Sequence, residues 1–211
     1  MEQKKGILVV SFGTSHLDTL ERTITAVEQY IAAQFPEYRV YRAFTSGMIL
    51  RKLKRKENLT FDNVEEALER MAADGIETAV IQPTHVINGI ENDRMLEAAE
   101  AYRDRFETMQ IGAPLLSTAE DYKKAVHAVM AEVDPAEDET LILMGHGTDH
   151  HANSAYPTLE YTFHLLGYRQ VLVGTVEGFP NLQNVQTKLE ITGCKKVVLM
   201  PFMLVAGDQK K

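Results

Sequence analysis

The chain has 211 residues, of which 45% are hydrophobic and 25% charged, and these values argue against disorder and low-complexity architectures. Its net charge of −8 argues against a general nucleic-acid binder or a protein of anionic membrane surfaces, since both need a basic face. The single cysteine, Cys194, excludes an intramolecular disulfide framework and a cysteine-based zinc cluster. The sequence holds no apolar run of membrane-spanning length and no signal-peptide pattern, so we expect a cytoplasmic protein.

Strand and helix patterns alternate along the first half of the chain. Residues 6–12 form a continuous apolar run, typical of a strand buried on both faces, and apolar residues at helical spacing follow at 17–31. Capping-box spacings predict two helix starts, Ser15 with Asp18 and Ser117 with Glu120. The other predicted elements of this half are strands at 38–45, 78–82 and 109–112 and helices at 64–71, 95–106 and 122–133.

An acidic, proline-containing segment at 134–139 is the best candidate for a linker, and the alternation restarts after it. The elements predicted beyond it are strands at 140–144, 170–176 and 197–200 and helices at 159–166 and 182–189. Alternating strands and helices imply parallel sheets with crossover helices. We therefore predict an α/β fold with two flavodoxin-like lobes, residues 1–135 and 140–211.

The two lobes are predicted to arise from an internal duplication. Three stretches recur at the carboxyl ends of predicted strands: SFGT at 11–14 with GHGT at 145–148, TSG at 45–47 with VEG at 176–178, and VIQP at 80–83 with VLMP at 198–201. After Pro83 the first half continues through another helix and strand, which have no counterpart after Pro201. We therefore expect the second lobe to be incomplete. Its apolar edge at 197–200 is expected to be exposed or covered by a partner chain, so a homo-oligomer is one expectation.

The candidate functional residues lie in the loops after the predicted strands, because ligands bind at the carboxyl ends of parallel strands. His146 lies between two glycines, and imidazole is suited both to proton transfer near pH 7 and to binding a transition metal. Glu177 follows the next strand, so we expect the two side chains on one rim as a ligand pair. Phe12 and Ser46 occupy the matching positions of the first lobe, which therefore lacks this pair.

Other candidates have weaker signals. His85 and Glu91 follow the third strand and are candidates for a binding cleft, although His85 by itself is more often structural. The basic run at 51–56 is either a solvated helix face or a patch that steers an anionic ligand. No glycine-rich nucleotide loop and no nucleophile elbow follows any predicted strand, so we expect no nucleotide cofactor.

Several stretches carry a resemblance to a known family: VVSFGTS at 9–15, RAFTSGMILRKL at 42–53, HVINGIE at 85–91, APLLS at 113–117, MGHGTDHHA at 144–152, VEGFP at 176–180 and MPFMLVAGD at 200–208. In this order they span nearly the whole chain, which resembles the sirohydrochlorin cobaltochelatases of the CbiK family, class II chelatases of anaerobic vitamin B12 synthesis. The resemblance implies two flavodoxin-like lobes with a tetrapyrrole cleft between them. It also implies insertion of Co2+ into sirohydrochlorin without a nucleotide.

The same resemblance implies roles for individual residues. It places the first active-site histidine of the family at His146, its metal-binding glutamate at Glu177 and a further acidic cleft residue at Glu91. The second metal-binding histidine of the family falls on Gln209, so the metal site is expected to lack one imidazole. The residues expected to bind the substrate are Phe12, Ser46, His85, Glu91 and Met203.

Two other functions stay open at the level of the sequence. One is a non-catalytic tetrapyrrole- or metal-binding protein of the same fold, which the glutamine at position 209 would suit. The other is a flavodoxin-like redox domain, for which a bound flavin would be the evidence. The main prediction is a metal chelatase, a lyase with a tetrapyrrole substrate and with no nucleic-acid or membrane partner.

Overall fold

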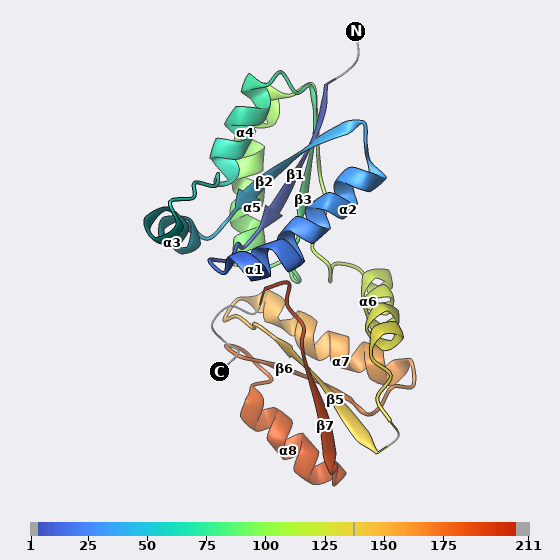
Figure 1. Cartoon of the computed structure of the whole chain (residues 1–211). Coiled ribbons are helices and arrows are strands. Elements are labelled where there is room, and N and C mark those ends of the chain that lie inside the picture. The colour runs from blue at the N-terminus through green and yellow to red at the C-terminus, as the bar shows by residue number, and fades with distance from the viewer. Residues whose placement is uncertain (1–3, 137, 206–211) are drawn as a thin grey trace. The chain divides into compact units, whose positions relative to one another are not determined.

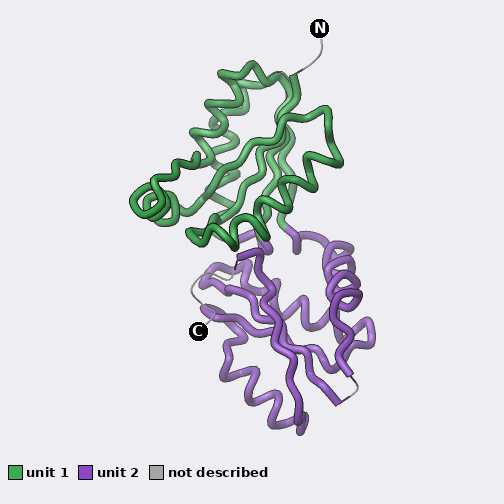
Figure 2. Tube along the Cα trace, viewed as in Figure 1, with its two compact units in different colours: residues 1–85, 90–114, 207–211 green, residues 86–89, 115–206 purple. Residues whose placement is uncertain are grey.

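The computed structural model describes residues 4–136 and 138–205, which form two compact units (Figures 1 and 2). Unit 1 consists of the described residues of 1–85 and 90–114, and unit 2 of those of 86–89 and 115–206. Each unit is built around one parallel β-sheet. Within the described ranges, no helix is long and apolar enough to cross a membrane.

Unit 1 contains four parallel strands in the order β2-β1-β3-β4. The strands are β1 (Lys5–Ser11), β2 (Tyr38–Phe44), β3 (Thr78–Pro83) and β4 (Thr108–Ile111). Strand β1 lies inside the sheet and is buried from Gly6 to Ser11, which explains its uninterrupted apolar run. The predicted α/β architecture with a parallel sheet is confirmed for this unit.

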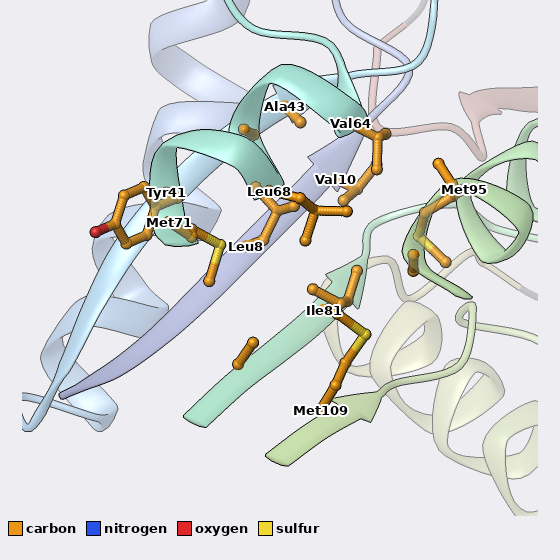
Figure 3. Close-up of a cluster of buried hydrophobic side chains, with 14 of the residues drawn as sticks. Leu8, Val10, Tyr41, Ala43, Val64, Leu68, Met71, Ile81, Met95 and Met109 are labelled. Atoms are coloured by element: carbon orange, nitrogen blue, oxygen red, sulfur yellow. The ribbon is translucent and has the colours of Figure 1, made fainter. Parts of the chain in front are cut away.

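Helices cover both faces of the unit 1 sheet (Figure 1). They are α1 (Leu17–Leu20), a π-helical turn (Glu21–Thr25), α2 (Ala26–Gln34), α3 (Gly47–Glu57), α4 (Val64–Ala73), α5 (Ile90–Ala101) and a 3-10 turn (Arg103–Arg105). Helices α4 and α5 share one buried cluster with the sheet, in which Leu68 and Met95 accompany Leu8 and Ile81 (Figure 3). The segment from α1 to α2 covers the other face with the fully buried Ile24.

Unit 2 contains three parallel strands in the order β6-β5-β7. Its elements are α6 (Ala119–Glu132), β5 (Glu139–Gly145), a 3-10 turn (His151–Ser154), α7 (Ala155–Leu165), β6 (Val171–Thr175), α8 (Leu182–Thr192) and β7 (Lys196–Pro201). Helices α6 and α7 share a buried cluster with the sheet, in which Val126 and Phe163 accompany Leu143. Helix α8 packs Val185 against Ile142 on the opposite face.

The internal duplication is visible in the pairing register of the two sheets. The corresponding pairs are Ser11–Phe44 with Gly145–Thr175, and Val10–Pro83 with Met144–Pro201. These are the positions at which the repeated sequence stretches align. Strands β1, β2 and β3 therefore correspond to β5, β6 and β7.

Both predicted capping boxes are wrong. Helix α1 has no capping side chain, so Ser15 and Asp18 do not form one. Helix α6 has a capping box one residue later than predicted, formed by Thr118 and Asp121. Both spacings occur in the sequence at this point, and local pattern cannot choose between them.

One helix prediction also needs correction. The helix predicted to reach Phe106 ends at Ala101, because Tyr102 leaves the helical conformation. Phe106 has an extended backbone, and its side chain is buried in the core of unit 1.

Helix α6 packs in unit 2, since Val126 and Val129 belong to the cluster around β5. The compact units therefore divide the chain before α6, and the lobes of residues 1–135 and 140–211 stay a prediction.

Strand β7 lies at the edge of its sheet, and among the described residues it pairs with β5 alone. Val197 and Leu199 of β7 are 48% and 64% exposed, whereas the corresponding Ala79 and Ile81 of β3 are fully buried. Strand β3 differs because β4 flanks it and α5 covers it. The apolar edge is thus present, and the homo-oligomer stays a prediction.

Candidate metal centre

His146 lies in the loop after β5, the central strand of unit 2. Gly147 follows it with a φ of 82°, a left-handed conformation that glycine adopts without strain. The His146 side chain is 48% exposed, and its Nδ1 lies 3.1 Å from the carbonyl oxygen of Gly147. A rigid strand end therefore presents a solvent-accessible imidazole.

Glu177 lies in the loop after β6, the strand next to β5. Its N–H donates to the carbonyl oxygen of His146 at 2.8 Å, so the backbone links the two residues. The side chains also approach, with 3.9 Å between Nδ1 of His146 and Oε2 of Glu177. The two residues predicted as a ligand pair therefore lie together within one unit.

The pair offers one imidazole nitrogen and one carboxylate oxygen, donors that suit a divalent transition metal. Within the described residues, no group of three histidine, cysteine, aspartate or glutamate side chains could hold a metal ion. A metal ion held by this pair would have further coordination positions open to other ligands.

Phe12 and Ser46 occupy the equivalent strand ends in unit 1. The N–H of Ser46 donates to the carbonyl oxygen of Phe12 at 3.2 Å, which repeats the bond between Glu177 and His146. Phe12 is 39% exposed, and the Ser46 hydroxyl accepts the N–H of Ile49 as the cap of α3. The same backbone hydrogen bond in unit 1 thus links an aromatic residue and a helix cap, and neither of these two residues is a typical metal ligand.

His85 and Glu91 lie beyond the carboxyl end of β3 in unit 1. In the described structure both ring nitrogens of His85 are buried without a hydrogen-bond partner, as is Oε2 of Glu91. Burial lowers the pKa of His85, and the nearby charge of Glu91 opposes this shift. Since an unpartnered buried polar atom costs free energy, these atoms mark a position that a ligand or water would complete.

Met203 lies just after β7 in unit 2. The preceding residue, Phe202, is buried and donates its N–H to the carbonyl oxygen of Met144 at 2.8 Å, which anchors this segment to the sheet. Met203 itself is only partly buried. Gln209, where the family resemblance places a second metal histidine, lies outside the described residues.

The basic run at 51–56 lies on α3, the helix that Ser46 caps. Leu53 is fully buried and anchors the helix, while Arg51, Lys54, Arg55 and Lys56 are exposed. Burial on one side and charge on the other is compatible with both predicted interpretations, a solvated face and a steering patch.

Two residues that the sequence analysis did not single out lie around the ligand pair. Tyr156 of α7 is 2% exposed, and its hydroxyl oxygen accepts the N–H of Gly147 at 3.4 Å. Burial raises the pKa of Tyr156, which keeps the phenol neutral. Asn153 contacts both loops through its side-chain amide. Their partners are backbone groups, which every sequence has, so no residue pattern identifies them.

Comparison with known proteins points to one family. The family model for cobalt chelatase (CbiK) matches residues 5–211. The chain is 39% identical over 206 residues to the sirohydrochlorin cobaltochelatase of Salmonella typhimurium, which covers 97% of this chain and 78% of that protein. It is 33% identical over 208 residues to the sirohydrochlorin cobaltochelatase CbiKC of Nitratidesulfovibrio vulgaris, covering 97% of this chain and 73% of that one.

A solved structure supports the fold independently. SirB from Bacillus subtilis with Fe3+ matches with a TM-score of 0.70 and 16% sequence identity, covering 98% of this chain and 79% of that chain. At this level of identity the likeness concerns the fold alone.

Proposed function

The chain belongs to the CbiK family of cobalt chelatases, and on this basis we propose that it inserts Co2+ into sirohydrochlorin in cobalamin biosynthesis. The observation that carries the proposal is the pair of His146 and Glu177, whose Nδ1 and Oε2 atoms lie 3.9 Å apart at neighbouring strand ends. Imidazole and carboxylate form a suitable donor set for a divalent transition metal. Both side chains are accessible to a substrate from outside the unit.

Insertion removes two protons from pyrrole nitrogens and moves Co2+ from the protein to the macrocycle. His146 binds the incoming Co2+ and then accepts one pyrrole proton once the metal has left its ring nitrogen, while the second proton passes to solvent water. Glu177 supplies a second ligand and offsets the charge of the dication. Affinity alone does not select cobalt, because Ni2+ and Cu2+ bind a given donor set more tightly. Geometry and metal supply therefore contribute to the choice of metal.

The substrate contacts follow the same proposal. Phe12 offers an exposed aromatic ring for stacking on a flat macrocycle. His85 and Glu91 offer buried atoms for hydrogen bonds that have no partner within the part of the chain that the structure describes. Ser46 and Met203 are assigned to substrate binding from their positions after β2 and β7.

The direct test is an anaerobic assay of the 211-residue chain with sirohydrochlorin and Co2+, followed by the visible absorbance of the macrocycle. We expect enzyme-dependent formation of cobalt sirohydrochlorin above the rate of the heat-denatured control. Tight binding of sirohydrochlorin with no enzyme-dependent insertion would overturn the proposal. That result would favour the non-catalytic binding protein, for which Gln209 is the specific observation.

Replacing Glu177 with glutamine is expected to weaken Co2+ binding at least about 10-fold, while sirohydrochlorin binding changes little. The amide keeps the shape of the side chain and removes the negative charge that favours a dication. Separate titrations of the protein with Co2+ and with sirohydrochlorin measure the two affinities. Glu190→Gln, on the exposed surface of α8, is the matched control. A Glu177 variant that loses only sirohydrochlorin affinity would contradict the assigned role.

Replacing Arg51, Lys52 and Lys54 together with glutamine is expected to weaken sirohydrochlorin binding on the order of 10-fold at low ionic strength. The substrate is a polycarboxylate, and the exposed charges of α3 would attract it at a distance. The loss should shrink at high salt, because screening weakens the attraction in the unmodified protein too. Equal affinities of both proteins at low salt would assign the run to a solvated helix face.

A further inference from the structure

Asn153 joins the two loops that carry the ligand pair. It lies in the 3-10 turn His151–Ser154, and its Oδ1 accepts the N–H of Thr148, two residues after His146, at 3.1 Å. Its Nδ2 donates to the carbonyl oxygen of Phe179, two residues after Glu177, at 2.5 Å. One amide side chain therefore closes a bridge between the loop of His146 and the loop of Glu177.

The space around this bridge is fitted to it. A Cβ atom at Gly178 would lie 2.3 Å from Oδ1 of Asn153, and one at Gly147 would lie 2.6 Å from the backbone nitrogen of Gly178. Both distances are too short for a side chain. The two glycines thus let the loops approach to backbone contact and leave room for the amide that holds them.

Unit 1 shows that the fold itself does not require the bridge. Its equivalent loops keep the same backbone link, since the N–H of Ser46 donates to Phe12 at 3.2 Å. They also keep the turn in which Thr14 Oγ1 accepts the N–H of His16, as Thr148 Oγ1 accepts the N–H of His150. In the register of the repeat, Asn153 corresponds to Thr19, which has no amide. The amide side chain is therefore present in the unit that carries the proposed metal ligands and absent from the equivalent position of unit 1, although the loops of both units have the same backbone hydrogen bonds.

We propose that Asn153 is a positioning residue, which sets the separation of His146 and Glu177 and thereby the affinity of the site for Co2+. The inference rests on the proposed function only in taking this pair as the Co2+ ligands. Residues that orient metal ligands typically change metal affinity or activity about 10- to 100-fold when mutated. Asn153 acts through the loops and does not itself touch the metal.

The test is Asn153→Ala, with Thr19→Ala as the matched control at the equivalent position of unit 1. We expect Co2+ affinity, measured by titration with the metal alone, to fall at least about 10-fold in the Asn153 variant and to stay unchanged in the control. Sirohydrochlorin affinity and far-UV circular dichroism should stay unchanged in both. In the insertion assay, KM for Co2+ should rise more than kcat falls. If Asn153→Ala does not fold, Asn153→Ser provides the same measurement with a smaller polar side chain.

A double-mutant cycle separates positioning from a general structural role. Combined with Glu177→Gln, Asn153→Ala should add little further loss of Co2+ affinity, because the pair that it positions is already broken. Unchanged Co2+ affinity in a folded Asn153 variant, or parallel losses of Co2+ and sirohydrochlorin affinity, would overturn the inference. Failure of the proposed function would give a different result. The wild-type chain would then bind Co2+ through His146 and Glu177 and still not insert it.

Discussion

Replacing His146 with alanine is expected to lower the rate of cobalt insertion by at least about 100-fold. In the proposed metal site the imidazole would supply the nitrogen donor beside Glu177, and no third histidine, cysteine or carboxylate completes a metal group in the described structure. Since the side chain is 48% exposed, its loss should change the free energy of unfolding by less than about 0.5 kcal/mol. Initial rates of insertion and urea denaturation of the same preparation measure the two effects.

The matched control for this change is His127→Ala. His127 is an exposed histidine of α6, away from the strand ends that carry the ligand pair, and it should leave both rate and stability unchanged. A His146 variant that inserts cobalt at a near-normal rate would remove His146 from the mechanism. A variant that loses activity together with its folded structure would assign the effect to stability.

Replacing Ile81 with alanine is expected to lower the free energy of unfolding by about 2–5 kcal/mol, whereas Leu199→Ala should lower it by less than about 0.5 kcal/mol. The two residues occupy the same position of the repeat. Ile81 has no exposed surface under α5, and Leu199 is 64% exposed on β7. Removing the side-chain carbons beyond Cβ leaves a cavity at Ile81, where the side chain is buried, and none at Leu199, where it is exposed.

Urea denaturation of the two variants tests this difference, with equal slopes required for a comparison of stabilities. Hydrogen exchange of β1 and β5 amides would show which unit each change affects. Similar losses in the free energy of unfolding for Ile81→Ala and Leu199→Ala would mean that the outer face of β7 is as well covered as that of β3. Such a result would indicate a partner on this edge, in agreement with the expected homo-oligomer.

Much of the fold follows from sequence pattern, because parallel strands buried on both faces leave unbroken apolar runs. The runs at 6–12 and 140–144 became the central strands β1 and β5, and the repeated loop sequences aligned with the pairing register. The proximity of His146 and Glu177 could be predicted from the strands that they follow. Two residues that follow adjacent parallel strands must lie at one edge of the sheet.

Helix starts and the division of the chain were harder, since several local solutions are equally good. Ser117 and Thr118 both have an acidic residue three positions later, and only the packed orientation of α6 selects Thr118. The acidic segment at 134–139 has the composition of a linker, but the helix before it places Val126 in the unit 2 core. Contacts across the fold, which are not encoded in neighbouring residues, decide such cases.

The sequence by itself determined the α/β class, the succession of strands and helices in each repeat and the two metal-ligand candidates, because these depend on hydrophobic period and on which strand a loop follows. Only the tertiary structure decided which side chains lost their contact with water and which backbone groups they reached. It buried both nitrogens of His85 without a hydrogen-bond partner among the described residues, left Leu199 exposed where its counterpart Ile81 is covered, and placed the amide of Asn153 across two loops. Burial and side chain–backbone hydrogen bonds depend on distances between residues remote in the chain, so no local pattern contains them.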